Sequence, residues 1–160
     1  MTKNNEQLFP LGKLFGLLTK QYISILSAKL EEIPLNRYYY PFWLIAQNSA
    51  TITQQNLSKQ LQIDKVVVVR IVDYLESVGF IKRIDNPQDR RSHLLEITKK
   101  GTPYVNIIEE AIISTDQLFL ENIGEKNQPV FTNELINLAD KMETIPGHRI
   151  ALFYDNIKND

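Results

Sequence analysis

The sequence predicts a mainly α-helical fold with one small β-hairpin. Apolar residues recur at helical spacing through most of the 160 residues. The spacing changes to the alternation of strands only at 80–84 and 92–97, and a polar turn separates these two segments. At this length one domain is the default, and the chain can bury a core. We therefore expect a single domain over 1–160.

The composition excludes several classes of protein. Cysteine is absent, which excludes disulfides, thiolate metal sites and catalytic thiols. The sequence contains no run of about 18 apolar residues, so a membrane span is not expected. The N-terminus lacks a signal-peptide core, so we expect a cytoplasmic protein. The net charge is only −1. The segment 51–101 nevertheless has nine Lys and Arg against six Asp and Glu, whereas the remainder has nine against thirteen. The basic excess therefore lies in one segment.

The first long helix is expected over 8–30, where a broad apolar stripe keeps helical spacing. A stripe of this width suggests burial against more than the helix's own domain. After Pro34 the next helix is expected over about 37–48, with Asn36 as its N-cap. Pro41 then falls beyond the first turn, where a proline would remove a backbone hydrogen bond.

Aromatic side chains around this second helix have two possible roles, and both stay open. They can simply fill the core between helices. Alternatively, they can form the wall of a pocket for a small apolar or aromatic effector. The candidate pocket residues are Phe15, Tyr22, Tyr39, Phe42 and Trp43.

The segment 51–101 contains the strongest pattern in the chain. Apolar residues one turn apart predict a short helix over 54–61, and a brief connection leads to Asp64, a good N-cap for another helix. The buried face of that helix is expected at Val68, Ile71, Val72, Leu75 and Val78. Gly79 is expected to end it in the left-handed conformation. Two helices joined in this way form a helix-turn-helix, whose second helix can enter a DNA major groove.

A hairpin follows, with strands at 80–84 and 92–97 and a charged tip between them. Thr98 is expected to cap a helix that runs to about Leu120. The sequence of helix, turn, helix, hairpin and helix is that of a winged helix-turn-helix, in which the hairpin lies against the DNA backbone or minor groove. The remaining chain predicts a last helix over about 129–144 and an apolar tail at 146–160.

Four consecutive valines at 66–69 allow two interpretations. β-branched residues favour strands, so a buried strand is the alternative. The N-cap before the valines and the glycine after the helical pattern favour a helix. Because successive helical residues are about 100° apart, only Val68 fits the buried stripe. Val66, Val67 and Val69 are then expected to face DNA.

These residues resemble the DNA-binding core of the MarR family of bacterial transcriptional regulators. The matching pieces are ITQQNLSKQL in the first helix, RIVDYLE in the recognition helix, GFIKR at the start of the wing, NPQDRRS at its tip and LEITKKG at its exit. The resemblance implies a homodimer formed through the first helix and the last two, with an effector pocket between these helices and the core. It also implies transcriptional regulation through a pseudo-palindromic operator.

The motif and the resemblance together indicate which residues contact DNA. The resemblance implies that Asp89 orients Arg91 at the wing tip and that Arg91 enters the minor groove. Arg70 on the recognition helix can reach a guanine edge or a phosphate. The remaining candidates are Gln54, Asn56, Lys59, Lys65, Val66, Val67, Val69, Tyr74 and Arg90.

The valines depart from the family, in which small polar residues are usual. Valine can contact a thymine methyl but cannot hydrogen-bond a base. This predicts an A·T-rich operator, read partly by DNA shape and bound with steep salt dependence. The alternative is a MarR-like ligand- or protein-binding scaffold with weak or lost specific DNA binding. No catalytic motif or metal-ligand spacing is visible, so we expect neither an enzyme nor a cofactor.

Overall fold

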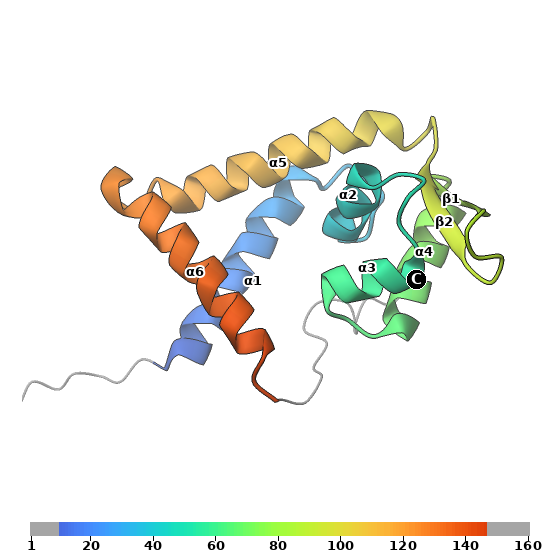
Figure 1. Cartoon of the computed structure of the whole chain (residues 1–160). Helices are drawn as coiled ribbons and strands as arrows, with labels where there is room; N and C mark the ends of the chain where they lie inside the picture. Colours follow the sequence, from blue (N-terminus) through green and yellow to red (C-terminus); the bar gives the residue numbers. More distant parts are fainter. Residues whose placement is uncertain (1–9, 147–160) are drawn as a thin grey trace, which may run out of the picture.

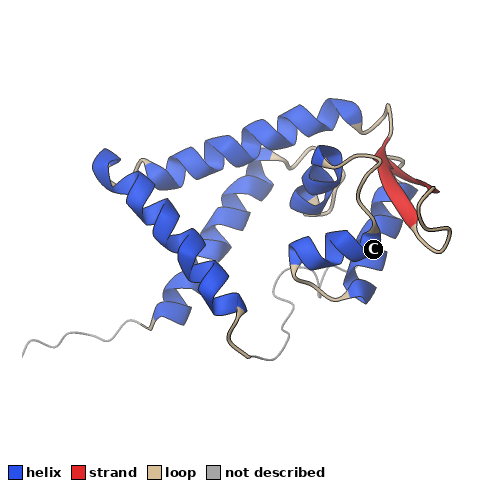
Figure 2. Cartoon of the chain, in the orientation of Figure 1, coloured by secondary structure: helices blue, strands red, loops and turns tan. Residues whose placement is uncertain are grey.

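The structure is a computed structural model that describes residues 10–146. Figure 2 shows a mainly helical chain with one hairpin, which confirms the fold class predicted from the sequence. The elements are α1 (Leu11–Lys29), α2 (Tyr39–Gln47), α3 (Gln54–Leu61), α4 (Lys65–Ser77), β1 (Ile81–Asp85), β2 (His93–Ile97), α5 (Thr102–Leu120), the 3-10 helix η1 (Glu125–Asn127) and α6 (Gln128–Glu143). Leu8, at the start of the predicted first helix, and the tail beyond 146 lie outside the described residues.

The chain divides into two regions that α5 connects (Figure 1). At one end lie α2, α3, α4, the hairpin and the start of α5; we call residues 30–108 the winged module. At the other end lie α1, the rest of α5 and α6; we call residues 11–29 and 109–145 the helical arm. Within the described part of the chain, no helix is both long enough and apolar enough to cross a membrane.

The core of the winged module is built around Phe42 and Phe80, which are both fully buried. Their ring centroids are 5.8 Å apart, and Tyr104 of α5 stacks on Phe80 at 4.6 Å. Other fully buried side chains come from each helix and strand of the module: Leu30, Leu35, Ile45, Leu57, Val68, Ile71, Leu75, Ile81, Leu95 and Ile108. A single chain therefore closes this core by itself.

Local hydrogen bonds fix the helix-turn-helix. Thr53 caps α3, because its side-chain oxygen accepts from the Asn56 N–H at 3.2 Å. Asp64 caps α4, because its Oδ1 accepts from the Val66 N–H at 2.7 Å. Gly79 follows α4 with a φ of 77°, the left-handed conformation that glycine adopts without strain. The predicted Asp64 cap and Gly79 stop are confirmed, and the four valines are helical.

The hairpin is attached to the segment that precedes α3. β1 and β2 are antiparallel, with Ile81 opposite Ile97. The Ala50 N–H donates to the Leu95 carbonyl at 2.8 Å, and the Leu95 N–H donates to the Ile52 carbonyl at 2.9 Å. The base of the wing is therefore held in place on the helix-turn-helix, and its tip projects into solvent.

Helix α2 begins later than the sequence predicted. Asn36 is not its N-cap, because Asn36 and Arg37 adopt positive φ values of 46° and 65° and Tyr38 precedes the helix. Pro41 is consequently the third residue of α2. The backbone N–H groups of a first turn have no intrahelical partner, so the proline removes no helical hydrogen bond. Because α2 begins later than predicted, Pro41 does not cost the helix a backbone hydrogen bond.

Thr98 also differs from the prediction. Helix α5 begins at Thr102 and its N-cap is Gly101. Thr98 Oγ1 donates to the Gly79 carbonyl at 2.7 Å and accepts from the Gly101 N–H at 3.1 Å. It therefore joins the end of the wing to the end of α4. Gly101 is required here because a Cβ would clash with the Phe80 carbonyl.

Candidate nucleic-acid interface

Helix α4 presents two valines to solvent. Val66 is 68% exposed and Val69 is 44% exposed, and Lys65 and Arg70 are exposed beside them. At about 100° per residue, Val66, Val69 and Arg70 share one face of the helix. That face lies opposite the buried one, which is Val67, Val68, Ile71, Val72 and Leu75.

The structure contradicts the prediction that Val67 faces DNA. Val67 is only 5% exposed and belongs to the hydrophobic core. Helix α4 contacts both α3 and β1. A helix covered from two sides buries a wider arc than a single i, i+3, i+4 stripe, and Val67 falls within that arc.

The structure places Tyr74 at the edge of the exposed face. Its hydroxyl donates to the Pro34 carbonyl at 3.2 Å, and its ring packs edge-on against Tyr38 with centroids 5.3 Å apart. Tyr74 is half-buried. Its hydroxyl attaches the segment before α2 to α4, and its contact with DNA stays a prediction.

A cluster of charged residues connects α4 to the wing. The Arg83 guanidinium pairs with the carboxylates of Asp73 and Glu76, and the Arg83 N–H donates to Glu76 Oε1 at 3.1 Å. We call these three residues the α4–β1 clamp. Sequence analysis missed the clamp, because charges seven and ten positions apart look the same as a solvated surface. The clamp fixes the wing relative to the recognition helix.

The tip of the wing is ordered by short side-chain contacts. Asn86 Nδ2 donates to Ser92 Oγ at 2.9 Å, which closes the turn. Asp89 Oδ1 accepts from the Arg91 N–H at 3.0 Å, so it holds Arg91 through the backbone. Arg90 and Arg91 are exposed. Neither side chain pairs with a carboxylate among residues 10–146. The wing therefore presents two cationic groups to a ligand.

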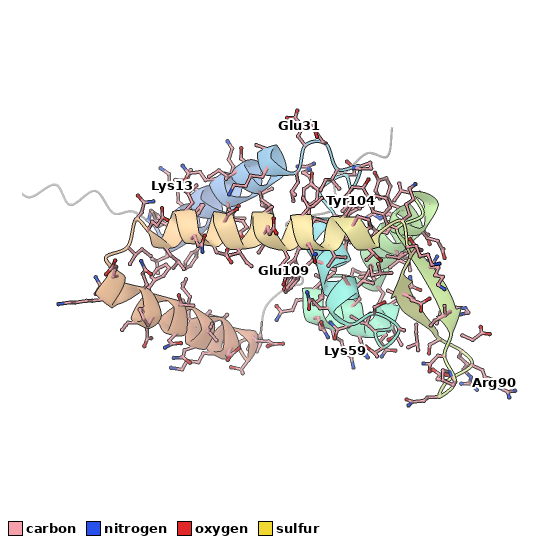
Figure 3. The ribbon with its side chains drawn as sticks, turned by 90° about the horizontal axis from the view of Figure 1, so that it is seen from above. Lys13, Glu31, Lys59, Arg90, Tyr104 and Glu109 are labelled. Atoms are coloured by element: carbon pink, nitrogen blue, oxygen red, sulfur yellow. The ribbon has the colours of Figure 1, made fainter. Side chains whose placement is uncertain are left out.

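The candidates on α3 are of two kinds. Asn56 and Lys59 are exposed, and Figure 3 shows Lys59 at the same edge of the winged module as Arg90 of the wing tip. Gln54 differs, because its Nε2 atom is buried without a hydrogen-bond partner in the described part of the chain. The Gln54 amide nitrogen is therefore not open to solvent, whereas Asn56, Lys59 and Lys65 are exposed, and the phosphate contacts of all four stay predictions.

Two of the predicted pocket residues belong to the closed core. Phe42 is fully buried, and Tyr39 is 6% exposed with its hydroxyl donating to the Leu30 carbonyl at 3.4 Å. Neither side chain lines an open pocket in this conformation. The core-packing interpretation of the aromatic cluster therefore holds for these two residues.

The other three pocket candidates lie nearer the surface. Phe15 is 45% exposed on α1, and Trp43 is half-buried with its ring stacked on Tyr40. The Tyr22 hydroxyl donates to Asp116 at 2.7 Å. Burial, together with this hydrogen bond, raises the pKa of the Tyr22 phenol well above its ordinary value. These residues stay candidates. Residues 10–146 contain no group of three or more metal-ligating side chains.

The helical arm exposes much apolar surface. No residue of α6 is buried, and in Figure 3 this helix lies apart from α1 and α5 along most of its length. Exposed large apolar residues of the arm are Leu11, Leu14, Phe15, Leu17, Leu18, Ile113, Leu118, Val130, Phe131, Leu135, Ile136, Leu138, Met142 and Ile145. Large exposed apolar patches mark interaction sites, so these side chains are candidates for one.

Comparison with known proteins identifies the family of the module. A model of the MarR family matches residues 43–93. The chain is 29% identical over 109 residues to the putative transcriptional regulatory protein for the hcr operon of Thauera aromatica. It is 26% identical over 96 residues to the multiple antibiotic resistance protein MarR of Escherichia coli (strain K12). These matches cover 68% and 60% of this chain, and 66% and 67% of the two relatives.

Solved structures share the fold. The MepR–DNA complex of S. aureus has a TM-score of 0.77 at 19% identity, and the match covers 84% of this chain and 99% of that one. The PcaV transcriptional regulator of Streptomyces coelicolor, in complex with its natural ligand, has a TM-score of 0.72 at 20% identity. That match covers 89% of this chain and 99% of PcaV. The family model over residues 43–93, the two relatives and the shared fold all support the MarR family of winged helix-turn-helix transcriptional regulators.

Proposed function

We propose that this protein binds a specific pseudo-palindromic operator as a homodimer and that a small apolar or aromatic effector changes this binding. The observation that carries the proposal is the combination of an exposed α4 face with an exposed pair of arginines, Arg90 and Arg91, on one rigid module. A recognition helix for the major groove and a cationic hairpin for the backbone or minor groove are the two parts that a winged helix needs. The S. aureus MepR structure, which shares this fold, contains DNA.

Phosphate contacts are expected around the rim of this surface. Lys59, Lys65 and Asn56 are exposed on α3 and at the start of α4. The basic excess of the sequence also lies within 51–101. Each phosphate neutralised by a cation releases a counterion, so the affinity should fall steeply with salt.

The proposed partner of the helical arm is a second copy of this chain. A pseudo-palindromic operator requires two-fold symmetry, with recognition helices about 34–36 Å apart. In a two-fold dimer the same patch faces itself, so exposed apolar residues on α1, α5 and α6 would bury one another. Sedimentation at micromolar concentration should give about twice the chain mass, and a well-folded monomer would contradict the dimer.

An effector would act by binding the two conformations of the dimer unequally. Phe15, Tyr22 and Trp43 are the remaining candidates for its contacts. PcaV, which shares the fold, has been solved with its natural ligand. We propose that the protein is a transcriptional regulator without catalytic activity and that it acts in the cytoplasm.

The test is selection of bound fragments from the source genome with purified protein, followed by titration of the best fragment at several salt concentrations. The proposal predicts a two-fold symmetric consensus and a steep salt slope. The alternative is a ligand- or protein-binding scaffold, motivated by the valines exposed on α4. A folded dimer that selects no sequence, yet binds a small molecule or a protein partner tightly, would support the scaffold.

A further inference from the structure

The exposed face of α4 has few groups that can hydrogen-bond a base. Asp73 lies on the same side of the helix as Val66 and Val69, but its carboxylate pairs with Arg83. Tyr74 lies at the edge of that side, but its hydroxyl donates to the Pro34 carbonyl. The fold therefore occupies two polar groups that could otherwise contact base edges.

Arg70 shares this face, and the exposed groups beside it are apolar. Val66 and Val69 are 68% and 44% exposed, which is unusual for valine. A β-branched side chain in a helix has essentially one rotamer, so its methyl groups point in fixed directions. Contact with a ligand would therefore lose little side-chain entropy and would remove apolar surface from water.

The spacing of the two valines suits neighbouring base pairs. Residues three apart in an α-helix are separated by about 4.5 Å along the axis. Base pairs of B-DNA are about 3.4 Å apart. In the major groove the C5 methyl of thymine is the apolar group that a base presents. Two valines one turn apart can therefore each contact a methyl group on the same or adjacent base steps.

We infer that Val66 and Val69 are specificity-determining residues that read the C5 methyl groups of thymines in each operator half-site. This inference rests on the proposed function, because it assumes that α4 enters the major groove. It goes further in that the chemical signal is the methyl group and not the hydrogen-bonding edge of the base. A 5-methylcytosine carries the same methyl group, so the protein should accept it where it rejects cytosine.

The experiment uses the full chain and synthetic duplexes of the operator obtained by genomic selection. At each base pair under α4, thymine is replaced in turn by uracil, by cytosine paired with guanine, and by 5-methylcytosine paired with guanine. Methyl reading predicts that thymine and 5-methylcytosine bind alike, and that uracil and cytosine bind about fourfold more weakly for each methyl lost, as expected for one buried carbon. Uracil outside the α4 site is the matched control.

Protein variants connect the effect to the two residues. Val66→Ala and Val69→Ala should each remove the preference for thymine over uracil at one position, whereas Val69→Thr, which keeps one methyl, should retain part of it. Readout by DNA shape predicts a different order: uracil would match thymine, and both cytosines would bind weakly. That order would overturn the inference. So would alanine variants that both keep the preference for thymine over uracil. In either case operator binding itself would remain intact. If no fragment is selected at all, the proposed function fails, and this inference fails with it.

Discussion

The winged module and the helical arm both contain many apolar side chains, but only the winged module buries them in a core. In the module, side chains such as Phe42, Phe80 and Leu95 have no exposed surface. In the arm, α6 has no buried residue and its apolar side chains are exposed. The core of the module is therefore closed within this one chain, with Leu26 and Ala111 of the arm at its edge. The arm leaves apolar side chains exposed, which fits the proposed dimer.

The contacts within the two regions also differ. Contacts inside the module are mainly apolar and buried. In the arm, α1 and α5 meet through the rings of Tyr22 and Phe119, whose centroids are 5.4 Å apart, and through polar contacts. Tyr22 donates to Asp116 at 2.7 Å and Lys29 donates to Ser114 at 2.6 Å, both in exposed positions. Exposed polar contacts contribute little net free energy. We infer that the arm is the part of the molecule most easily changed by an effector or a partner.

The largest expected effect comes from opening the module core. Phe42→Ala removes a fully buried ring and should lower the free energy of unfolding by about 3–5 kcal/mol. Urea denaturation measures this change. Phe131→Ala is the matched control in the arm, where the ring is 40% exposed. It should change mainly how the unfolding midpoint depends on protein concentration. Equal, concentration-independent losses in both variants would contradict the difference between the regions.

The second prediction breaks the proposed dimer. Phe131 and Leu135 lie one turn apart on α6 and are 40% and 41% exposed. Phe131→Glu combined with Leu135→Glu would place unpaired carboxylates in an apolar interface and should weaken dimerisation more than a hundredfold, about 3 kcal/mol. Sedimentation should then show a folded monomer with unchanged module helices by circular dichroism. A dimer that persists would show that α6 does not form the interface.

The third prediction concerns the tip of the wing. Arg91→Ala removes an exposed guanidinium that contributes nothing to the core. Affinity for the selected operator should fall by about 1–3 kcal/mol at fixed salt, with no change in unfolding. Lys126→Ala, in η1 on the arm, is the matched control because it also removes one exposed cation. Equal effects of the two variants would show that only total charge matters.

Sequence analysis predicted well the features that depend on neighbouring residues. The Asp64 cap, the Gly79 stop and the pairing of the two wing strands are local, and each is confirmed. Predictions that needed a distant partner were less successful. The hydrogen bond of the Tyr74 hydroxyl was missed, because its partner, the Pro34 carbonyl, is 40 residues away.

The same limit explains the other differences. Val67 is buried because two elements cover α4, and the periodicity of one helix does not show how many neighbours it has. The start of α2 moved because two consecutive residues, Asn36 and Arg37, adopt left-handed backbone conformations that non-glycine residues seldom take. The apolar stripe of the first helix was visible in the sequence. Whether a stripe faces its own chain or another one is a property of the folded molecule.

The fourth prediction tests the link between recognition helix and wing. Arg83→Met removes the cation of the α4–β1 clamp and leaves the carboxylates of Asp73 and Glu76 unpaired beside the DNA-facing surface. Because these groups are partly exposed, the loss of folding stability should be about 1 kcal/mol. Operator affinity should fall as well, since the unpaired carboxylates would repel phosphates. In the Arg83→Met, Glu76→Gln double variant part of the affinity should return. No recovery would show that repulsion by the Glu76 carboxylate is not the cause, and unchanged affinity in Arg83→Met would show that the clamp does not affect binding.

The smallest expected effect is a gain in stability. Ala50 has a φ of 61°, held there by the hydrogen bond from its N–H to the Leu95 carbonyl at 2.8 Å. An L-residue in this conformation costs about 1–2 kcal/mol, which glycine avoids, although glycine also makes the unfolded chain more flexible. Ala50→Gly should therefore raise the free energy of unfolding by about 0.5–1 kcal/mol. Ala28→Gly, in the last turn of α1, is the same substitution in a right-handed helix and should lower it by up to about 1 kcal/mol. Opposite signs in urea denaturation would confirm that the connection between α2 and α3 is strained at Ala50. A loss of stability in both variants would show that the backbone at Ala50 relaxes without cost.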